Sequence, residues 1–186
     1  AGAANVDIFH LHFQESLEKS LRAVELACRA DAPGTEAIGR FWAARALYIM
    51  GNLERSRLHA ASMLAPAERL RDRYWLASAL LANENVSRLK GDWVAARDLS
   101  DRSLAVLSAD PRLLLSRVLL EYEVGEFEPG EAFLERLLGT MRQTSPGLGL
   151  EYVYSAMVIP MVARITGLGD RLGIAEAAAR TVLSSP

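Results

Sequence analysis

The chain has 186 residues, of which 51% are hydrophobic and 24% charged, and its formal net charge is −2. This balance is normal for a folded globular protein and argues against disorder and against a surface that binds nucleic acid through general positive charge. The single cysteine, Cys28, excludes an internal disulfide, and no apolar window is long enough for a transmembrane helix.

Apolar spacing and helix-breaking residues predict an all-α chain of about nine helices with no strand. In chain order the predicted helices run over about 7–30, 35–50, 53–65, 69–90, 93–108, 111–124, 127–143, 148–167 and 171–184. In the first helix, apolar residues recur every three or four positions and predict one buried stripe, formed by Leu17, Leu21, Val24 and Cys28. Pro66 and Pro111 are expected to punctuate the ends of units.

Four predicted helix boundaries share one pattern, in which a glycine is followed by a polar or small residue and then by an apolar one. They read Met50-Gly51-Asn52-Leu53, Lys90-Gly91-Asp92-Trp93, Val124-Gly125-Glu126-Phe127 and, more loosely, Thr166-Gly167-Leu168-Gly169. Their glycines stand 40, 34 and 42 positions apart along the chain. Glycine takes the left-handed conformation that ends a helix, and Asn52 or Asp92 suits the N-cap of the next one. We therefore expect a positive φ at Gly91.

Residues after each glycine repeat a second pattern that indicates contact between neighbouring helices. The apolar residues expected to pack at the turns are Leu53, Trp93 and Phe127. Of these, Trp93 is expected to be buried. Small residues follow five positions beyond each glycine, where two helices must approach closely, at Ser56, Ala96 and Gly130. The same face continues one turn at a time with Ala60, Ser100 and Leu134, and then with Met63, Ser103 and Leu137.

These residues resemble the tetratricopeptide repeat, and the resemblance covers about residues 36–186. It implies a right-handed superhelix of antiparallel helical hairpins, stacked because a single hairpin cannot bury its own apolar face. We expect one domain over 1–186, a fragment of a longer protein. Its units are expected at about 5–34, 35–66, 69–108, 111–143 and 148–186.

The resemblance also implies that the first helices of successive units line a concave groove. The groove candidates are Arg45, Tyr48, Asn85, Arg88, Leu119, Tyr122, Tyr154 and Arg164. Arginines and tyrosines suit carboxylates and extended backbones, so we expect the guanidinium groups of Arg45, Arg88 and Arg164 to be exposed on one side. The alternative is that these arginines pair with glutamates inside the stack, at Glu84, Glu121 or Glu123.

A second resemblance rests on residues 151–167 and 182–186, which look like the tetratricopeptide region of large bacterial multidomain signalling proteins. Those proteins combine an ATPase module with a nucleotide-cyclase domain or a LuxR-type DNA-binding domain. The resemblance implies a cytoplasmic interaction or sensor region whose partner is a protein, a peptide or another domain of the parent chain. No direct contact with nucleic acid or membrane is expected, and a homodimer is left open.

No motif predicts an enzyme, a cofactor or a metal site. His10 and His12 fall on different faces of a helix, and the glycines of 167–173 lack the spacing and the preceding strand of a dinucleotide loop. Two functions remain open. A non-catalytic scaffold that binds protein or peptide is favoured by an open groove rich in arginine. A small-molecule effector-sensing module is favoured by a pocket lined by Tyr48, Trp93 or Tyr122.

Overall fold

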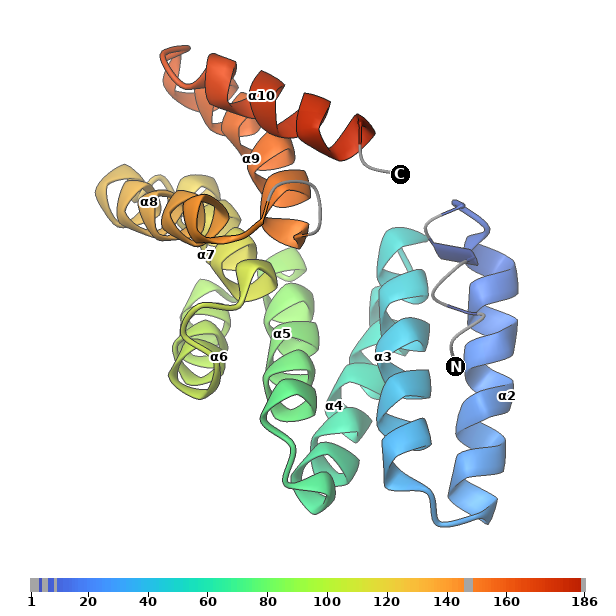
Figure 1. The fold of residues 1–186 in the computed structure, drawn as a ribbon. Helices are drawn as coiled ribbons and strands as arrows, with labels where there is room; N and C mark the ends of the chain where they lie inside the picture. Colours follow the sequence, from blue (N-terminus) through green and yellow to red (C-terminus); the bar gives the residue numbers. More distant parts are fainter. Residues whose placement is uncertain (1–3, 5–6, 9, 146–148, 185–186) are drawn as a thin grey trace. The chain divides into compact units, whose positions relative to one another are not determined.

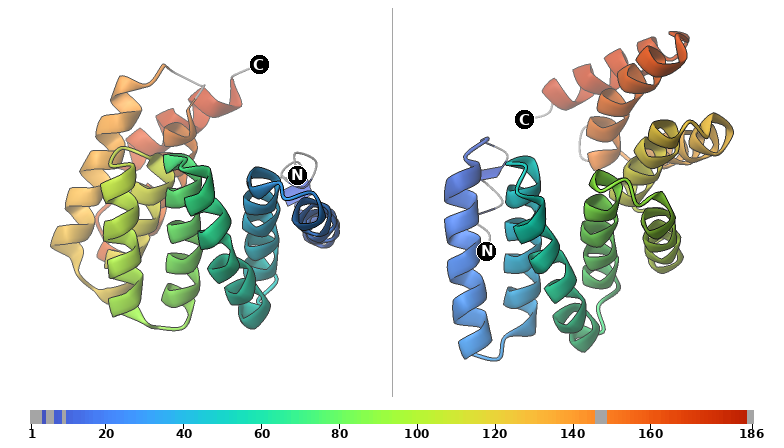
Figure 2. Two further views of the ribbon diagram at one scale, coloured as in Figure 1. Left: turned by 90° about the horizontal axis from the view of Figure 1, so that it is seen from below. Right: turned by 180° about the vertical axis from the view of Figure 1, so that it is seen from behind.

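A computed structural model of the chain describes residues 4, 7–8, 10–145 and 149–184, and every regular element in this part is a helix. In Figure 1 and Figure 2, consecutive helices of each unit pack as neighbours that reverse direction. The predicted all-α helical-repeat fold is therefore confirmed. Contacts divide the chain into two compact units, Ala1–Leu107 and Ser108–Pro186, here called the N-terminal and the C-terminal unit. The division falls between the predicted hairpins 69–108 and 111–143.

The helices of the N-terminal unit each pack against the next one along the chain. They are α2 (Phe13–Arg29), α3 (Pro33–Ile49), α4 (Leu53–Leu70), α5 (Arg73–Leu89) and α6 (Trp93–Val106). The core lies where α3, α4 and α5 meet, and it buries Phe41, Met63 and Val86. Trp42 and Trp75 pack against the edge of this cluster and are only partly buried.

The C-terminal unit consists of two hairpins in its described residues. Its helices are α7 (Pro111–Val124), α8 (Phe127–Gln143), α9 (Leu150–Thr166) and α10 (Leu172–Leu183). α7 packs on α8, α9 packs on α10, and α9 also contacts both α7 and α8. Leu113, Leu134 and Val158 come from three different helices of this unit and are completely buried.

The two predicted boundaries between α4 and α5 are wrong. α4 continues through Pro66 to Leu70, although proline removes one backbone donor from the helix, because Pro66 is itself buried on the packed face. The helix ends instead at Arg71, whose φ is 51°, and the carboxylate of Asp72 caps α5 by accepting from the Tyr74 N–H at 2.8 Å. The predicted helix over 69–90 therefore begins only at Arg73.

The glycine turns behave as the sequence predicted. Gly51, Gly91, Gly125 and Gly167 have φ values of 76°, 72°, 87° and 74°. Each ends a helix in the left-handed conformation, where a β-carbon is penalised. The side chain of Asp92 then accepts from the backbone N–H of Ala95 at 3.1 Å, which satisfies a free donor of the first turn of α6.

The structure extends this repeat to a turn that lacks glycine. Leu11 has a φ of 63°, its N–H donates to the carbonyl three positions earlier (3.0 Å), and the N–H of His12 donates five positions back (2.8 Å). The turn at Gly51 makes the same two bonds, at 3.0 and 2.8 Å. Leu11 precedes Gly51 by 40 positions, which is also the spacing from Gly51 to Gly91. The helix predicted over 7–30 is therefore interrupted at 10–12.

A pair of serine hydroxyl bonds repeats with the same period. Ser16 donates from its hydroxyl to the carbonyl of Ala4 at 2.8 Å, and Ser56 donates to the carbonyl of Ala44 at 2.9 Å. Both serines are buried at their helix contacts. The turn at Leu11 and the start of α2 thus repeat the geometry of the turn at Gly51 and the start of α4, with leucine standing where the next two turns have glycine.

Exchanging residues at equivalent turns should change stability in opposite directions. Leu11 is 71% exposed, so Leu11→Gly removes the left-handed strain with little loss of packing and should stabilise the chain by about 0.5–1 kcal/mol. Gly91→Ala introduces the same strain and should destabilise it by about 1 kcal/mol. Urea unfolding followed by circular dichroism measures both changes. Changes of the same sign would contradict the equivalence of the two turns.

Several side chains follow the predicted register and others do not. The close-approach residues Ser56, Ala96 and Gly130 are buried, as predicted. The prediction of a buried Trp93 is wrong: it is the first residue of α6 and is only partly buried. Cys28 was also predicted to be buried and is exposed, because the small residue Ala27 takes the buried position in the last turns of α2.

Candidate functional site

The predicted groove residues of the N-terminal unit do not form an exposed row of cations. Arg88 is only 8% exposed, and its guanidinium donates to the Tyr48 hydroxyl at 3.3 Å. The expectation of an exposed guanidinium at Arg88 is therefore wrong. Arg45 is exposed and Asn85 is half-buried. Of the four groove candidates in this unit, Tyr48 and Arg88 contact each other directly in the structure, and their hydrogen bond joins α3 to α5.

The groove candidates of the C-terminal unit lie in different surroundings. Tyr122 is buried on α7, Leu119 and Tyr154 are half-buried, and Arg164 is exposed on α9. Only Tyr122 lines the cleft described next. The predicted groove shared by all the candidates stays a prediction.

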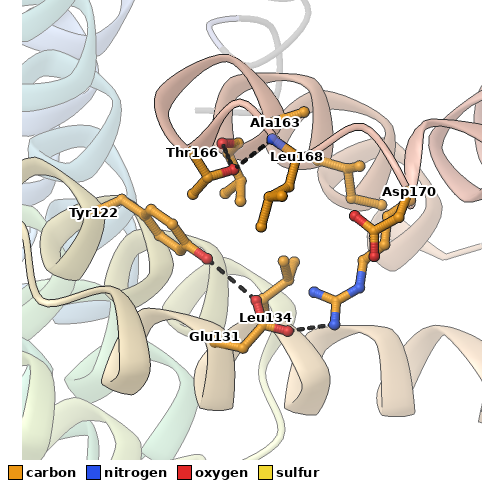
Figure 3. Close-up of a pocket in the computed structure, with 10 residues that line it drawn as sticks. Tyr122, Glu131, Leu134, Ala163, Thr166, Leu168 and Asp170 are labelled. Carbon is orange, nitrogen blue, oxygen red and sulfur yellow. Dashed lines mark hydrogen bonds and ion pairs between the residues drawn. The ribbon is translucent and has the colours of Figure 1, made fainter.

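A small cleft lies within the C-terminal unit, between α7, α8, α9 and the connection from α9 to α10 (Figure 3). Its volume is about 130 Å³. Its lining is mainly apolar but includes three charged side chains, and consists of Tyr122, Glu131, Leu134, Ile159, Val162, Ala163, Thr166, Leu168, Asp170 and Arg171. An apolar cleft with a few polar groups is the usual form of a binding site in a helical protein.

Tyr122 is held at one side of the cleft by α8. Gly130 has no side chain, and a β-carbon there would lie 2.7 Å from the Tyr122 ring, so the ring rests directly on the α8 backbone. The Tyr122 hydroxyl then donates to a carboxylate oxygen of Glu131 at 3.2 Å. Burial, together with the charge of Glu131, raises the pKa of the Tyr122 phenol. Tyr122 is therefore a neutral donor at physiological pH.

Arg171 closes the opposite side of the cleft through two ion pairs. Its guanidinium pairs with Glu131 and, at 2.8 Å, with Glu135 (the first pair is drawn in Figure 3). The hydrogen bond from Arg171 lowers the pKa of the Glu131 carboxyl, although partial burial acts against it. Glu131 is thus ionised and joins α7, α8 and the α9–α10 connection in one polar network.

The α9–α10 connection places an apolar side chain at the mouth of the cleft. Gly167 ends α9 with a φ of 74°, and the Thr166 hydroxyl accepts from the Leu168 N–H at 3.2 Å while donating to the Val162 carbonyl at 2.9 Å. This local arrangement projects Leu168 outward, so that 67% of it is exposed. The segment discounted as a dinucleotide loop is a helix-terminating turn that forms one wall of the cleft.

The mouth widens into a shallower depression of about 500 Å³ that shares four residues with the cleft. Phe127 and Ile165 flank it, each about half exposed, and Glu128 stands beside them. The surrounding segment is strongly acidic, because 118–135 contains six glutamates and no lysine or arginine. The C-terminal unit therefore presents an apolar depression bordered by negative charge, opposite in sign to the predicted arginine groove.

Comparison with known proteins gives no match, neither to a family model nor to a curated protein. Among the described residues, no cluster of histidine, cysteine, aspartate and glutamate could hold a metal ion. In the same part of the chain no helix is long and apolar enough to cross a membrane.

Sequence reasoning found Tyr122 and missed the residues that meet it. Glu131 looked like an ordinary glutamate on a helix surface, and Arg171 lies 40 positions further along the chain. One available signal was the run of glutamates around the exposed Phe127. The other was Leu168, an apolar residue inside a glycine turn.

Proposed function

We propose that the chain is a non-catalytic helical-repeat scaffold that binds a protein or peptide partner, and that the cleft of the C-terminal unit receives an apolar side chain of that partner. The observation that carries this proposal is the position of the cleft. Its apolar lining continues outward into exposed side chains at Phe127, Ile165 and Leu168, instead of being closed over. Exposed apolar residues that gather at one place mark interaction sites.

The size of the cleft favours a side chain of a larger partner over a complete small molecule. Sites for small-molecule ligands have volumes of about 300–1,000 Å³ and enclose most of the ligand. The cleft measures about 130 Å³, close to the volume of one large apolar side chain, and its wider mouth is open. Tyr122 does line it, as a small-molecule sensor would require. The cleft is too small for a complete ligand, and the depression of about 500 Å³ at its mouth is too shallow to enclose one, which argues against that alternative.

The kind of parent protein and the cellular location that we propose come from the sequence resemblance alone. In the proposal, the partner is a separate protein or another domain of a longer bacterial signalling or transcriptional regulator in the cytoplasm. Such a role needs a surface that recognises a segment, and it needs no catalytic group. The Tyr122–Glu131–Arg171 network supports it by keeping the cleft walls fixed, since each of the three side chains comes from a different element.

Filling the cleft should abolish this binding. Ala163 lines the cleft, and Ala163→Phe would occupy the space that a partner side chain needs. Linear peptides selected on the parent chain by display should bind Ala163→Phe at least about tenfold more weakly. Ala177→Phe, at an exposed position of α10, is the matched control and should bind with the parent affinity. Equal affinity for the parent chain and Ala163→Phe would contradict the proposal, as would the failure of every selection.

A further inference from the structure

The two carboxylates that line the cleft of the C-terminal unit differ in how they are engaged. Glu131 uses both of its oxygens, since one accepts from the Tyr122 hydroxyl and the other pairs with Arg171. Asp170 is exposed and makes no hydrogen bond or ion pair with any residue that the structure describes, although its charge acts on the neighbouring Arg171. Figure 3 shows Asp170 across the cleft from Tyr122. The Asp170 carboxylate is therefore open to a group that enters the cleft.

The cation in the described lining of the cleft is already neutralised. Arg171 pairs with two carboxylates of α8, those of Glu131 and, at 2.8 Å, Glu135. Three negative charges, on Glu131, Glu135 and Asp170, thus stand against the one positive charge of Arg171. The cleft and its immediate support carry a net charge of −2.

The exposed Arg164 of α9 does not offset this charge, because it lies on another side of the helix. Four residues of α9 line the cleft, namely Ile159, Val162, Ala163 and Thr166. With 3.6 residues in each turn, Arg164 lies about 150° around the helix axis from the centre of these four. The negative charge at the cleft is therefore local to it.

The inner wall of the cleft requires hydrocarbon, whereas its mouth disfavours a wholly apolar occupant. Leu134, Ile159 and Val162 form the wall and are buried. An apolar side chain that fills the cleft would also separate Asp170 from part of its water without offering it a hydrogen bond, which costs free energy. An acidic side chain would bring a like charge to Asp170. A hydrocarbon stem with a cation at its end satisfies both parts of the cleft.

We propose that the cleft receives a lysine side chain of the partner, with its methylene stem against the apolar inner wall and its ammonium group paired with Asp170. This inference rests on the proposed function, and it specifies the apolar group that enters the cleft as the stem of a lysine. Lysine carries a compact charge on a flexible four-carbon stem and commonly buries that stem while its ammonium group stays near water. A cleft of about 130 Å³ accommodates one side chain of this kind.

The depression at the mouth of the cleft favours the same side chain. The charged residues in its described lining are Glu128 and Glu131, which are both negative. A lysine that approaches through the depression therefore meets carboxylates before it reaches Asp170. Complementary charge of this kind favours the correct partner and raises the rate of association.

Peptides selected by display on the parent chain test the inference. Those whose binding Ala163→Phe abolishes use the cleft, and each of them should contain a lysine on which its affinity depends. Such peptides are resynthesised with norleucine in place of that lysine, because norleucine keeps the four-carbon stem and lacks the ammonium group. Fluorescence anisotropy measures the dissociation constants. The norleucine peptides should bind the parent chain about five- to tenfold more weakly, the usual effect of losing a hydrogen bond between charged groups.

A variant of the chain tests the part played by Asp170. Asp170→Asn keeps the size of the side chain and removes its charge. It should weaken the lysine peptides about five- to tenfold and leave the norleucine peptides unchanged. Asp101→Asn, at an exposed aspartate of the N-terminal unit, is the matched control and should leave both kinds of peptide unchanged. A preference for lysine over norleucine that survives in Asp170→Asn would overturn the inference.

The inference and the proposed function fail in different ways. If the peptides that need an open cleft contain no such lysine, or bind equally well with norleucine in its place, the lysine inference is overturned and the cleft proposal stands. If no selected peptide is affected by Ala163→Phe, the cleft proposal itself fails, and the lysine inference fails with it.

Discussion

Leu134→Ala is expected to lower the free energy of unfolding by about 2–5 kcal/mol. Leu134 is completely buried in α8 and forms part of the inner wall of the cleft. Alanine would leave a void that the surrounding helices cannot close fully, because α7, α8 and α9 are already in contact with one another. Urea unfolding followed by far-ultraviolet circular dichroism measures the change.

Leu183→Ala is the matched control for this loss. Leu183 is 85% exposed at the last residue of α10, so the substitution removes a side chain of the same size from solvent instead of from the core. The expected change is within about 0.5 kcal/mol. A Leu134→Ala variant as stable as Leu183→Ala would mean that α8 does not pack as described, and the cleft would lose its inner wall.

Gly130→Ala is expected to destabilise the chain by up to about 2 kcal/mol, although alanine is the better helix former. The gain in helix propensity is about 1 kcal/mol, and overpacking costs about 1–3 kcal/mol. The new β-carbon would lie 2.7 Å from the Tyr122 ring, which cannot stay in place. Moving the ring also stretches the hydrogen bond from Tyr122 to Glu131, so the variant should bind peptides more weakly.

Gly139→Ala in the same helix is expected to change stability in the opposite direction. A β-carbon at Gly139 meets no atom within 4 Å, so only the propensity gain remains and the variant should be stabilised by about 0.5–1 kcal/mol. Thermal unfolding of the two variants beside the parent chain tests the pair. If both substitutions stabilise the chain, Tyr122 does not rest on α8 and the described geometry of the cleft is wrong.

The turns were predictable from sequence because their causes are local. Glycine in the left-handed conformation and the cap at Asp92 involve atoms within five residues of each other, so the order of residue types at Gly91 is enough to predict them. The turn at Leu11 has the same geometry without the residue that signals it. Packing of α2 on α3 offsets the strain there, and packing between distant segments is invisible to a local pattern.

Burial of individual side chains was predicted less well, for the same reason. The sequence predicts a helix end at Pro66, yet α4 continues four residues further because Pro66 lies on its packed face. Arg88 reads as a surface cation, yet it lies against Tyr48, which is 40 positions away along the chain. Contacts of this kind depend on how one hairpin stacks on the next.

The sequence by itself determined the all-α class, the position of each glycine turn and the small residues at which paired helices approach. Each of these depends on the conformation or size of a residue at a fixed spacing. Only the tertiary structure decided where the cleft lies, because Tyr122, Glu131 and Arg171 meet through the path of the α9–α10 connection. It also decided which face of α9 is buried. Apolar residues surround most of that helix, so periodicity cannot distinguish the buried Val158 from the exposed Met161, and contacts with α7, α8 and α10 make the choice.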